Sequence, residues 1–430
     1  MSTVRVGIAG YGTVGRATAQ ILAAQPERIA ARCGARLEVT AVCRRTPVAA
    51  GKAPVGARVY RDWRELVASP DVDIVVETIG GTDAARAVVR AALTAGKPVV
   101  TANKNLLAAH GEELLELAAA QRLPLGYEAA VAGGIPVIRA LAESSAGDRL
   151  HAVYGILNGT ANYILSRMES DGVEFPFALA EAQRRGYAEA DPTWDVDGLD
   201  ARDKLAILAR LAFGGRVDPA RIGVMGIRNV TAMDMVYARR LEASIRLVAS
   251  AQLGESGVAI SVRPWLVPRR SLLAQVEGVN NAVFLEGERL GTQMFYGRGA
   301  GGDPTAVAVL SDLMEIAADL AGGKLAAKAA AGFRETTDLA ISAEPPPVPW
   351  YLRLVIRDRP GVLARLAAGL AAHGINIDFV LQEPGMPKER LPFVITVEPV
   401  SEPLMLRAAA ALDAAGDLLE PVLLLRMMPA

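Results

Sequence analysis

Short apolar runs alternate with amphipathic stretches over the first third of the chain. They predict strands at Val4–Ala9, Leu37–Cys43, Ile74–Thr78 and Pro98–Thr101, and helices at Val14–Ala24, Ala84–Ala95 and Leu114–Gln121. Strands that alternate with helices imply parallel βαβ units. We therefore expect an α/β fold in which residues 1–134 form a doubly wound parallel sheet.

The pattern changes after about Gly134. It predicts helices at Val137–Ser144, Ala161–Glu169 and Lys204–Phe213, a strand at His151–Leu157, and alternating strands at Val258–Leu266 and Gln275–Leu285. We interpret residues 135–302 as an α+β domain for substrate binding and dimerisation. A long apolar helix within residues 303–323 is expected to pack back on the first domain.

A proline-rich segment precedes the last part of the chain, so we assign residues 324–347 to a linker and 348–430 to a separate domain. Its predicted elements are Trp350–Arg357, Gly361–Ala372, Ile375–Gln382, Leu391–Glu398, Leu404–Ala415 and Pro421–Met427. Their order is βαββαβ, a ferredoxin-like arrangement. We expect a chain that ends at Ser342 to stay active if its dimer survives.

Composition narrows the choice of protein class. The chain has 46 Lys and Arg against 47 Asp and Glu, and a net charge of −1 offers no basic field for nucleic acid or for an anionic membrane. Two cysteines, Cys33 and Cys43, give neither a disulfide framework nor a zinc motif. There is no leader-like start and no apolar run of membrane-spanning length. We expect a cytoplasmic protein.

A glycine-rich turn follows the first predicted strand and opens a helix. It reads Gly10-Tyr11-Gly12-Thr13-Val14-Gly15. In this context Gly10 permits a tight turn, Gly12 lets the backbone approach a pyrophosphate, and Gly15 lets helix and strand pack closely. The helix start adds amide donors and a positive dipole end. The turn predicts a dinucleotide site, and a purely structural turn is the alternative.

The end of the second strand indicates which dinucleotide is bound. An enzyme that uses NAD usually has an acidic residue there to hold the ribose 2′-hydroxyl. This chain has Arg44 and Arg45 instead, and guanidinium groups suit the 2′-phosphate of NADP. We predict NADP, with NAD also possible. Two solvated surface arginines are the alternative.

Residues 186–205 form an acidic segment that ends in an apolar helix. Asp200 and Lys204 are four apart and share one helix face, where a carboxylate can hold an ammonium group while the lysine faces a reacting oxygen. Lys104 follows a strand whose carboxyl end faces the ligand crevice. An ordinary helix ion pair and a surface lysine are the alternatives. Thr160 is expected to cap the helix that follows it.

Six segments together resemble homoserine dehydrogenases over roughly residues 4–340. They are GIAGYGTVG (7–15), TANKNLLA (101–108), EAAVAGGIP (128–136), GILNGTANYIL (155–165), GYAEADPTWDVDGLDARDKLAIL (186–208) and GRGAGGDPTA (297–306). The resemblance implies a Rossmann-type first domain. It also implies the NAD(P)-dependent interconversion of L-homoserine and L-aspartate 4-semialdehyde, a step in threonine and methionine biosynthesis.

The resemblance also implies residue roles. Lys204 exchanges the proton at the hydroxyl and Lys104 assists, since none of the three histidines lies in a matching segment. Substrate binding falls to Glu189, Asp200, Asp195, Thr160 and Tyr187. Cofactor binding falls to Gly10, Gly12, Thr13, Val14, Gly15, Arg44, Arg45, Gly80, Lys104, Gly186 and Gly301. A monovalent cation, Na⁺ or K⁺, maps to Glu128, Val131, Gly133 and Ile135.

The C-terminal domain resembles ACT domains through Asp358–Leu363 and Gly374–Ile377. Such domains commonly pair between subunits and bind amino acids, which implies a homodimer or homotetramer. The resemblance makes threonine the expected effector, with Gly361 and Asn376 at its site. A purely oligomerising domain is the alternative.

Two other functions compete with this interpretation. Aspartate-semialdehyde dehydrogenase chemistry needs a nucleophilic cysteine, and both cysteines lie in the first βαβ unit, far from the substrate segments. A non-catalytic NADP-binding amino-acid sensor is the second alternative. The presence of Glu189, Asp200 and Lys204 argues against it.

Overall fold

The computed structural model describes residues 2–45, 53–323, 337–342 and 345–429. Most of the linker predicted at 324–347 therefore lies outside the described residues. The chain divides into two compact units. The first comprises Met1–Leu150, Asp203–Arg221 and Val283–Leu339, and the second comprises His151–Arg202, Ile222–Ala282 and Ala340–Ala430.

The first unit contains a fully parallel sheet in the order β3-β2-β1-β4-β5-β6. Its strands are β1 (Ser2–Ala9), β2 (Ala35–Cys43), β3 (Arg58–Tyr60), β4 (Ile74–Glu77), β5 (Val99–Thr101) and β6 (Leu125–Gly126). Its first helices are α1 (Thr13–Ala24), α2 (Pro26–Cys33), α3 (Trp63–Ala68), α4 (Asp83–Thr94) and α5 (Lys104–Ala120). The predicted doubly wound α/β sheet is confirmed. The helix predicted from Leu114 begins ten residues earlier, because Asn103 caps it at Lys104.

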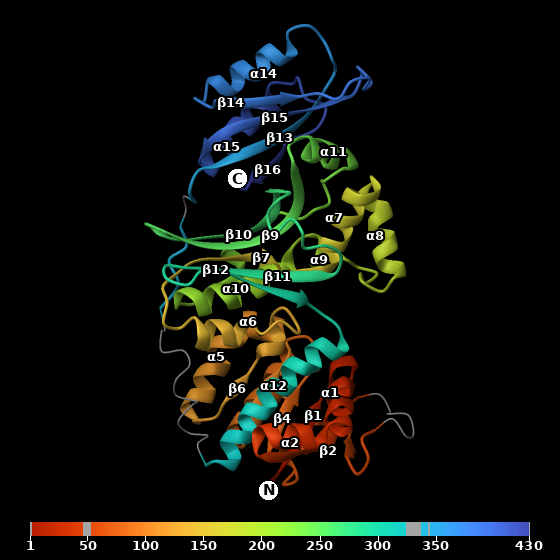
Figure 1. Ribbon diagram of the computed structural model, residues 1–430, viewed down its shortest axis with the longest axis vertical. Helices are drawn as coiled ribbons and strands as arrows, with labels where there is room; N and C mark the ends of the chain where they lie inside the picture. Colours follow the sequence, from red (N-terminus) through yellow and green to blue (C-terminus); the bar gives the residue numbers. More distant parts are fainter. Residues whose placement is uncertain (1, 46–52, 324–336, 343–344, 430) are drawn as a thin grey trace. The chain divides into compact units, whose positions relative to one another are not determined.

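Helices cover both faces of this sheet (Figure 1). Residues of β1 and β2 pack on one face against α1, α2 and α12 (Gly302–Ala321), and Val309, Leu313 and Ile316 belong to that core. The opposite core includes residues of α3, α4 and α5. The unit also holds η1 (Glu128–Ala130), α6 (Val137–Arg139), η2 (Ala140–Ser144), η3 (Pro219–Arg221) and β12 (Gly291–Arg298). It holds β11 (Asn280–Gly287) from Val283 onward, and the first three residues of that strand belong to the second unit.

The second unit is built on a mixed sheet in which the strand order is β7-β9-β10-β16-β13-β15-β14. Its first elements are β7 (Leu150–Ile156), α7 (Gly159–Asp171), α8 (Phe175–Arg184), α9 (Thr193–Val196), α10 (Leu199–Phe213), β8 (Gly223–Val224), α11 (Ala232–Arg240), β9 (Ala243–Gly254) and β10 (Gly257–Pro268). β9 and β10 form a long antiparallel pair, and α10 continues into the first unit. The strand predicted from Gln275 begins only at Asn280.

The C-terminal domain has the predicted βαββαβ order. Its elements are β13 (Val348–Ile356), α14 (Val362–Ala371), β14 (Ile377–Leu381), β15 (Leu391–Val400), α15 (Glu402–Ala414) and β16 (Leu423–Met427). β16 runs parallel to β10 with Trp265 opposite Arg426, so this domain extends the sheet of the second unit. Beneath that joint Arg353 forms an ion pair with the fully buried Asp234 of α11, which also accepts a hydrogen bond from Tyr351 at 2.7 Å.

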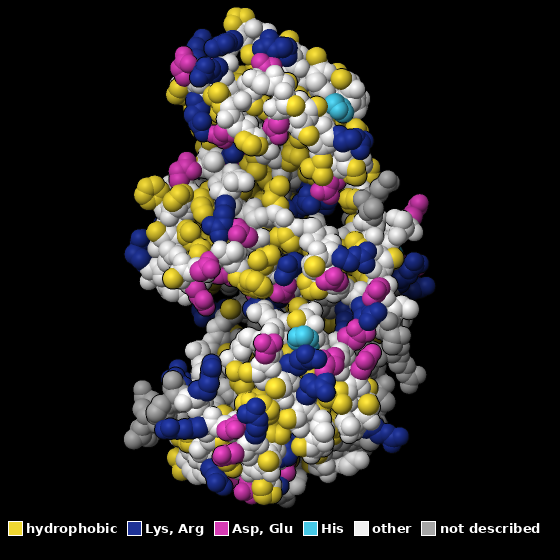
Figure 2. Space-filling view, turned by 180° about the vertical axis from the view of Figure 1, so that it is seen from behind, with side chains coloured by type: hydrophobic (Ala, Val, Ile, Leu, Met, Phe, Trp, Pro, Cys, Tyr) yellow, Lys and Arg dark blue, Asp and Glu magenta, His cyan; other side chains and the backbone are white. Residues whose placement is uncertain are grey.

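The surface bears out the balanced charge of the sequence. Basic and acidic side chains are interspersed over the face in Figure 2. Among the described residues, no helix is both long and apolar enough to cross a membrane. Over the same ranges, no cluster of three or more His, Cys, Asp or Glu side chains is arranged to hold a metal ion.

Candidate active site

The glycine-rich turn between β1 and α1 has the geometry that its glycines require. Gly10 has a φ of 105°, and a Cβ there would lie 2.4 Å from the backbone of Thr78. A Cβ on Gly15 would lie 2.3 Å from the Gly10 carbonyl oxygen, whereas one on Gly12 would meet nothing within 4 Å. The helix therefore packs tightly on the strand while the backbone at Gly12 stays open to a phosphate.

A second helix start lies beside this turn. Gly301 has a φ of 122° and precedes α12, and a Cβ on Gly302 would lie 3.0 Å from the side chain of Thr13 at the start of α1. Two helix N-termini thus adjoin in the first unit. Free amide donors and positive dipole ends at one place favour an anionic ligand.

Arg44 and Arg45 directly follow β2 and are exposed. The Arg44 amide donates to the Tyr60 carbonyl at 3.1 Å, which fixes the backbone there but leaves the guanidinium at the surface. Residues 46–52, which come next, lie outside the described residues. The two arginines are placed at the carboxyl edge of the sheet, as the phosphate interpretation requires.

A buried hydrogen-bond chain links the ends of β4 and β5. Glu77 is fully buried and accepts from the Thr101 hydroxyl at 2.6 Å, while Thr101 Oγ1 accepts from the Asn103 amide at 3.1 Å. Asn103 caps α5 and donates from Nδ2 to the Gly81 carbonyl at 2.7 Å. Burial raises the pKa of the Glu77 carboxyl. This series of hydrogen bonds fixes the backbone at Lys104, the first residue of α5, and at the Gly80–Gly81 turn.

The segment expected to bind a monovalent cation is an ordered loop of the first unit. The Glu128 carboxylate accepts from the Ile138 and Arg139 amides, each at 2.9 Å, so it holds α6 in place. Ala132 and Gly133 both have a φ of 55°, and Gly133 adjoins the backbone of Gly299. Such a reversal of the chain presents several carbonyl oxygens in a short stretch. Any cation here would depend on carbonyls and not on the Glu128 side chain.

In the second unit, Asn158 joins two of the expected substrate residues. Its Nδ2 donates to Asp195 Oδ1 at 2.7 Å and to Asp200 Oδ2 at 2.8 Å. Asp200 is only 5% exposed, although it lies in the first turn of α10. Asn158 thus brings two carboxylates of the acidic segment together at one amide group.

Thr160 does not cap α7, so that prediction was wrong. Asn158 is the cap and accepts from the Ala161 amide at 2.7 Å, since its side chain reaches one turn ahead while Thr160 already lies inside the helix. The Thr160 hydroxyl instead donates to the Tyr187 carbonyl at 2.7 Å. The structure thereby brings Thr160 and Tyr187 together.

The remaining substrate and catalytic candidates differ in exposure. Gly186, with a φ of 74°, and Tyr187 and Glu189 are exposed. Gln183 donates to the Glu189 carbonyl at 3.0 Å and orders that backbone. Lys204 is 8% exposed and lies one turn after Asp200 in α10.

The candidate effector residues lie in the C-terminal domain. Gly361 precedes α14 with a φ of 86°, and Asn376 follows the turn at Gly374. Both are exposed, and the Asn376 carbonyl accepts from the Glu398 amide at 3.1 Å.

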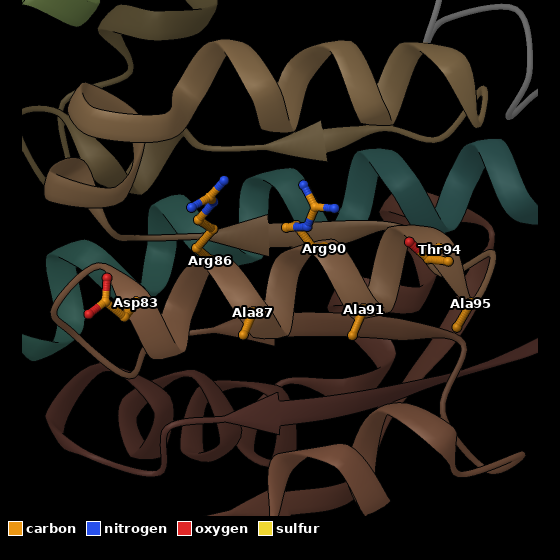
Figure 3. A pocket seen from close by; sticks show the side chains of 7 residues that line it. All are labelled: Asp83, Arg86, Ala87, Arg90, Ala91, Thr94 and Ala95. Carbon is orange, nitrogen blue, oxygen red and sulfur yellow. The ribbon is translucent and has the colours of Figure 1, made fainter.

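A hollow along α4 lies on the first unit (Figure 3), and none of the predicted site residues lines it. Arg86 and Arg90 line it, and both pair with Glu113 of α5. We assign these contacts to helix packing. The cysteines are also structural, because both are buried and burial raises the pKa of the Cys43 thiol to about 11.

Sequence reasoning did not identify Asn158 or Glu77. Both are buried polar residues whose partners come from segments far away in the chain. The segment 155–165 contains Asn158, but nothing in the sequence alone distinguishes this asparagine as the residue that reaches Asp195 and Asp200.

The parallel sheet with its glycine-rich turn and adjoining helix starts defines an NAD-binding oxidoreductase. Comparison with known families gives the same class in detail. The NAD-binding domain of homoserine dehydrogenase matches residues 10–128, the homoserine dehydrogenase domain matches 136–314, and the ACT domain matches 350–417. The chain belongs to the homoserine dehydrogenase family.

Its relatives include a homoserine dehydrogenase of Pseudomonas aeruginosa, 39% identical over 99% of both chains. One from Corynebacterium glutamicum is 42% identical over 89% of this chain and 86% of the relative. Among solved structures, the homoserine dehydrogenase of Thiobacillus denitrificans has a TM-score of 0.90 at 37% identity and covers 100% of this chain and 99% of its own. A hyperthermophilic archaeal one in complex with NADPH has a TM-score of 0.62 at 30% identity, covering 73% of this chain and 97% of its own.

Proposed function

We propose that the chain interconverts L-homoserine and L-aspartate 4-semialdehyde with NADP as its preferred cofactor, and that Lys204 exchanges the proton. The observation that supports this most directly is the pair of buried charged groups on successive turns of α10, Asp200 and Lys204. The Asp200 carboxylate suits the substrate ammonium group, and the Lys204 amine suits the substrate hydroxyl.

The chemistry divides between the cofactor and the chain. A bound nicotinamide supplies the hydride acceptor. The homoserine hydroxyl must lose its proton as the carbonyl forms, and an amine held near that oxygen is able to accept it. We assign this step to Lys204 with Lys104 assisting, and the binding of the amino acid to Glu189, Asp195, Asp200, Thr160 and Tyr187.

The first unit provides all of the proposed cofactor residues except Gly186, which belongs to the second unit. The open backbone at Gly12 and the adjoining helix starts at Thr13 and Gly302 fit a pyrophosphate. Val14, Gly80, Gly186 and Gly301 complete the proposed set. The preference for NADP rests on exposed Arg44 and Arg45, and the NADPH complex of the archaeal relative is consistent with it.

Other parts of the proposal concern the ion, the effector and the assembly. Carbonyl oxygens of Glu128, Val131, Gly133 and Ile135 would hold Na⁺ or K⁺, which orders the loop without entering the reaction. The ACT domain would bind threonine at Gly361 and Asn376. We further propose a cytoplasmic homodimer or homotetramer, on the basis of the cysteine content and of the ACT domain.

A spectrophotometric assay at 340 nm with homoserine and either NADP or NAD tests the proposal. We expect turnover with both and a lower KM for NADP. Binding of NADP without any turnover would instead identify the non-catalytic sensor. Equal KM values for the two cofactors would contradict the role of the arginine pair.

A further inference from the structure

Asn158 engages its side-chain oxygen and both hydrogens of its side-chain amide nitrogen. Oδ1 accepts from the Ala161 amide, and the two hydrogens of Nδ2 go to Asp195 Oδ1 and Asp200 Oδ2, at distances of 2.7 to 2.8 Å. The residue is 5% exposed. Because the oxygen accepts on one side and both N–H groups donate on the other, these contacts fix the orientation of the buried amide and hold the two carboxylates in one arrangement.

The chemistry of an amide explains why an asparagine suits this place. An amide nitrogen only donates, so each aspartate must present a lone pair to it, as an ionised carboxylate does. The amide adds no charge of its own. A lysine or arginine in its place would hold the carboxylates but would also neutralise them, and the attraction for a cationic ligand would fall.

The backbone that positions Asn158 is itself fixed from a second side. Asn281 is fully buried and donates to the Leu157 carbonyl at 2.8 Å. A Cβ on Gly159 would lie 2.6 Å from the Val279 carbonyl oxygen, so only glycine allows this close approach. The turn between β7 and α7 is therefore anchored before and after Asn158.

We propose that Asn158 is the positioning residue that holds Asp195 and Asp200 together as the receptor for the substrate ammonium. This inference rests on the substrate-binding roles proposed above for the two aspartates. Asn158 acts through them, because both hydrogens of its amide nitrogen are engaged with the two carboxylates.

The test compares Asn158→Ser with Asn158→Ala in the full-length enzyme. Serine is a comparable helix cap but reaches neither aspartate, whereas alanine removes cap and bridge together. Loss of a hydrogen bond to a charged group predicts that Asn158→Ser raises the KM for homoserine about 10- to 100-fold. The KM for NADP and the melting temperature should change little in the serine variant, and the alanine variant should also be less stable.

The pH profile gives a second readout that helix stability alone would not alter. Without the shared donor, the two nearby negative charges raise the pKa of one carboxyl. The acidic limb of kcat/KM for homoserine should therefore move to higher pH in Asn158→Ser. Asn158→Asp keeps the helix cap and adds a third carboxylate, so it should move the acidic limb of kcat/KM to still higher pH. This variant replaces Asn158→Ser in the test if the serine variant does not fold.

The aspartate variants separate the two proposals. If Asp195→Asn and Asp200→Asn both leave the KM for homoserine unchanged, the substrate roles are wrong and the positioning role fails with them. If they raise it but Asn158→Ser does not, the positioning role alone is overturned. Equal losses toward homoserine and NADP, with an unmoved pH profile, would show that Asn158 only stabilises the fold.

Discussion

Lys204 is a lysine in a mostly buried turn of α10, a position that lysines seldom occupy without a function. We predict that Lys204→Met lowers kcat by about 10²- to 10⁴-fold, which is the usual contribution of a positioned proton-transfer group. NADP binding, measured by fluorescence titration, should stay near the parent value. Lys388→Met is the control, because that side chain is exposed in the C-terminal domain. A folded Lys204→Met enzyme with normal kcat would rule out the proposed role.

Arg44 allows a prediction on cofactor choice. An exposed guanidinium next to a 2′-phosphate makes a charge-assisted contact of about 1.5–3 kcal/mol, so Arg44→Ala should raise the KM for NADP about 10- to 100-fold. The KM for NAD should hardly change, because NAD has no such phosphate. Arg32→Ala, an exposed arginine of α2, is the matched control. A parallel rise for both cofactors would contradict the assignment.

At the scale of residues, the roles that depend on neighbouring positions in the sequence could be predicted. The hydrogen-bond partners that the fold brings together could not. Gly10 and Gly15 could be assigned from spacing, because a glycine turn before a helix has few solutions. Thr160 was misassigned, since Asn158 competes for the same cap and wins. Glu77 gave no signal, because its side-chain partner Thr101 becomes a neighbour only when the parallel strands β4 and β5 align.

Among the elements, α12 and η1 are joined through a titratable group. Asp312 of α12 is 7% exposed and accepts from the Glu128 amide at 2.9 Å, and burial raises its carboxyl pKa to about 8. The folded protein therefore holds a proton there that the unfolded chain has released above about pH 4. The free energy of unfolding therefore falls as the pH rises from about 4 toward 8, because the folded protein must keep Asp312 protonated while the unfolded chain does not.

Asp312→Asn should remove this dependence, because the amide keeps an acceptor for the Glu128 amide and never ionises. The free energy of unfolding of the variant minus that of the parent should increase with pH between about 4 and 8, by at most about 1.4 kcal/mol per pH unit. Urea denaturation at pH 5, 6.5 and 8 measures it. A constant difference over this range would show that Asp312 is ionised in the folded protein.

The elements themselves were predictable where their hydrophobic period was clear. The strands β1, β2 and β4 and all six elements of the C-terminal domain were found within a few residues. β9 and α11 were missed. β9 is buried along most of its length and so lacks the alternation of a half-exposed strand, and α11 has a charged residue, Asp234, on its buried side.

For the molecule as a whole, the joint between the C-terminal domain and the rest of the second unit changes one expectation. The proline-rich segment suggested a domain that could be removed after Ser342. The structure instead pairs β16 with β10 and places Arg353 and Tyr351 against buried Asp234. Removing the domain would leave that carboxylate without either partner and expose the edge of β10.

We therefore predict that a chain ending at Ser342 is unstable, and that Arg353→Met reproduces much of the loss. Removing one partner of a buried ion pair typically costs about 3–5 kcal/mol. Thermal unfolding of Arg353→Met should show a lower midpoint than that of Arg359→Met, an exposed control. A truncated enzyme with the melting temperature of the parent would show that this joint contributes little.

Regulation is then best tested with a point variant that leaves the joint intact. Asn376 is exposed beyond the turn at Gly374, away from Arg353 in sequence and with its carbonyl already paired to the Glu398 amide. An effector shifts activity only if it binds one conformational state better than another, and a weaker effector site reduces inhibition without changing uninhibited turnover. Asn376→Ala should therefore raise the threonine concentration needed for half-inhibition and leave kcat unchanged. Asn376→Asp, which keeps the shape and adds a charge, should raise it as well. Threonine inhibition that competes with homoserine and persists in both variants would place the effector in the substrate site and leave the ACT domain a structural role.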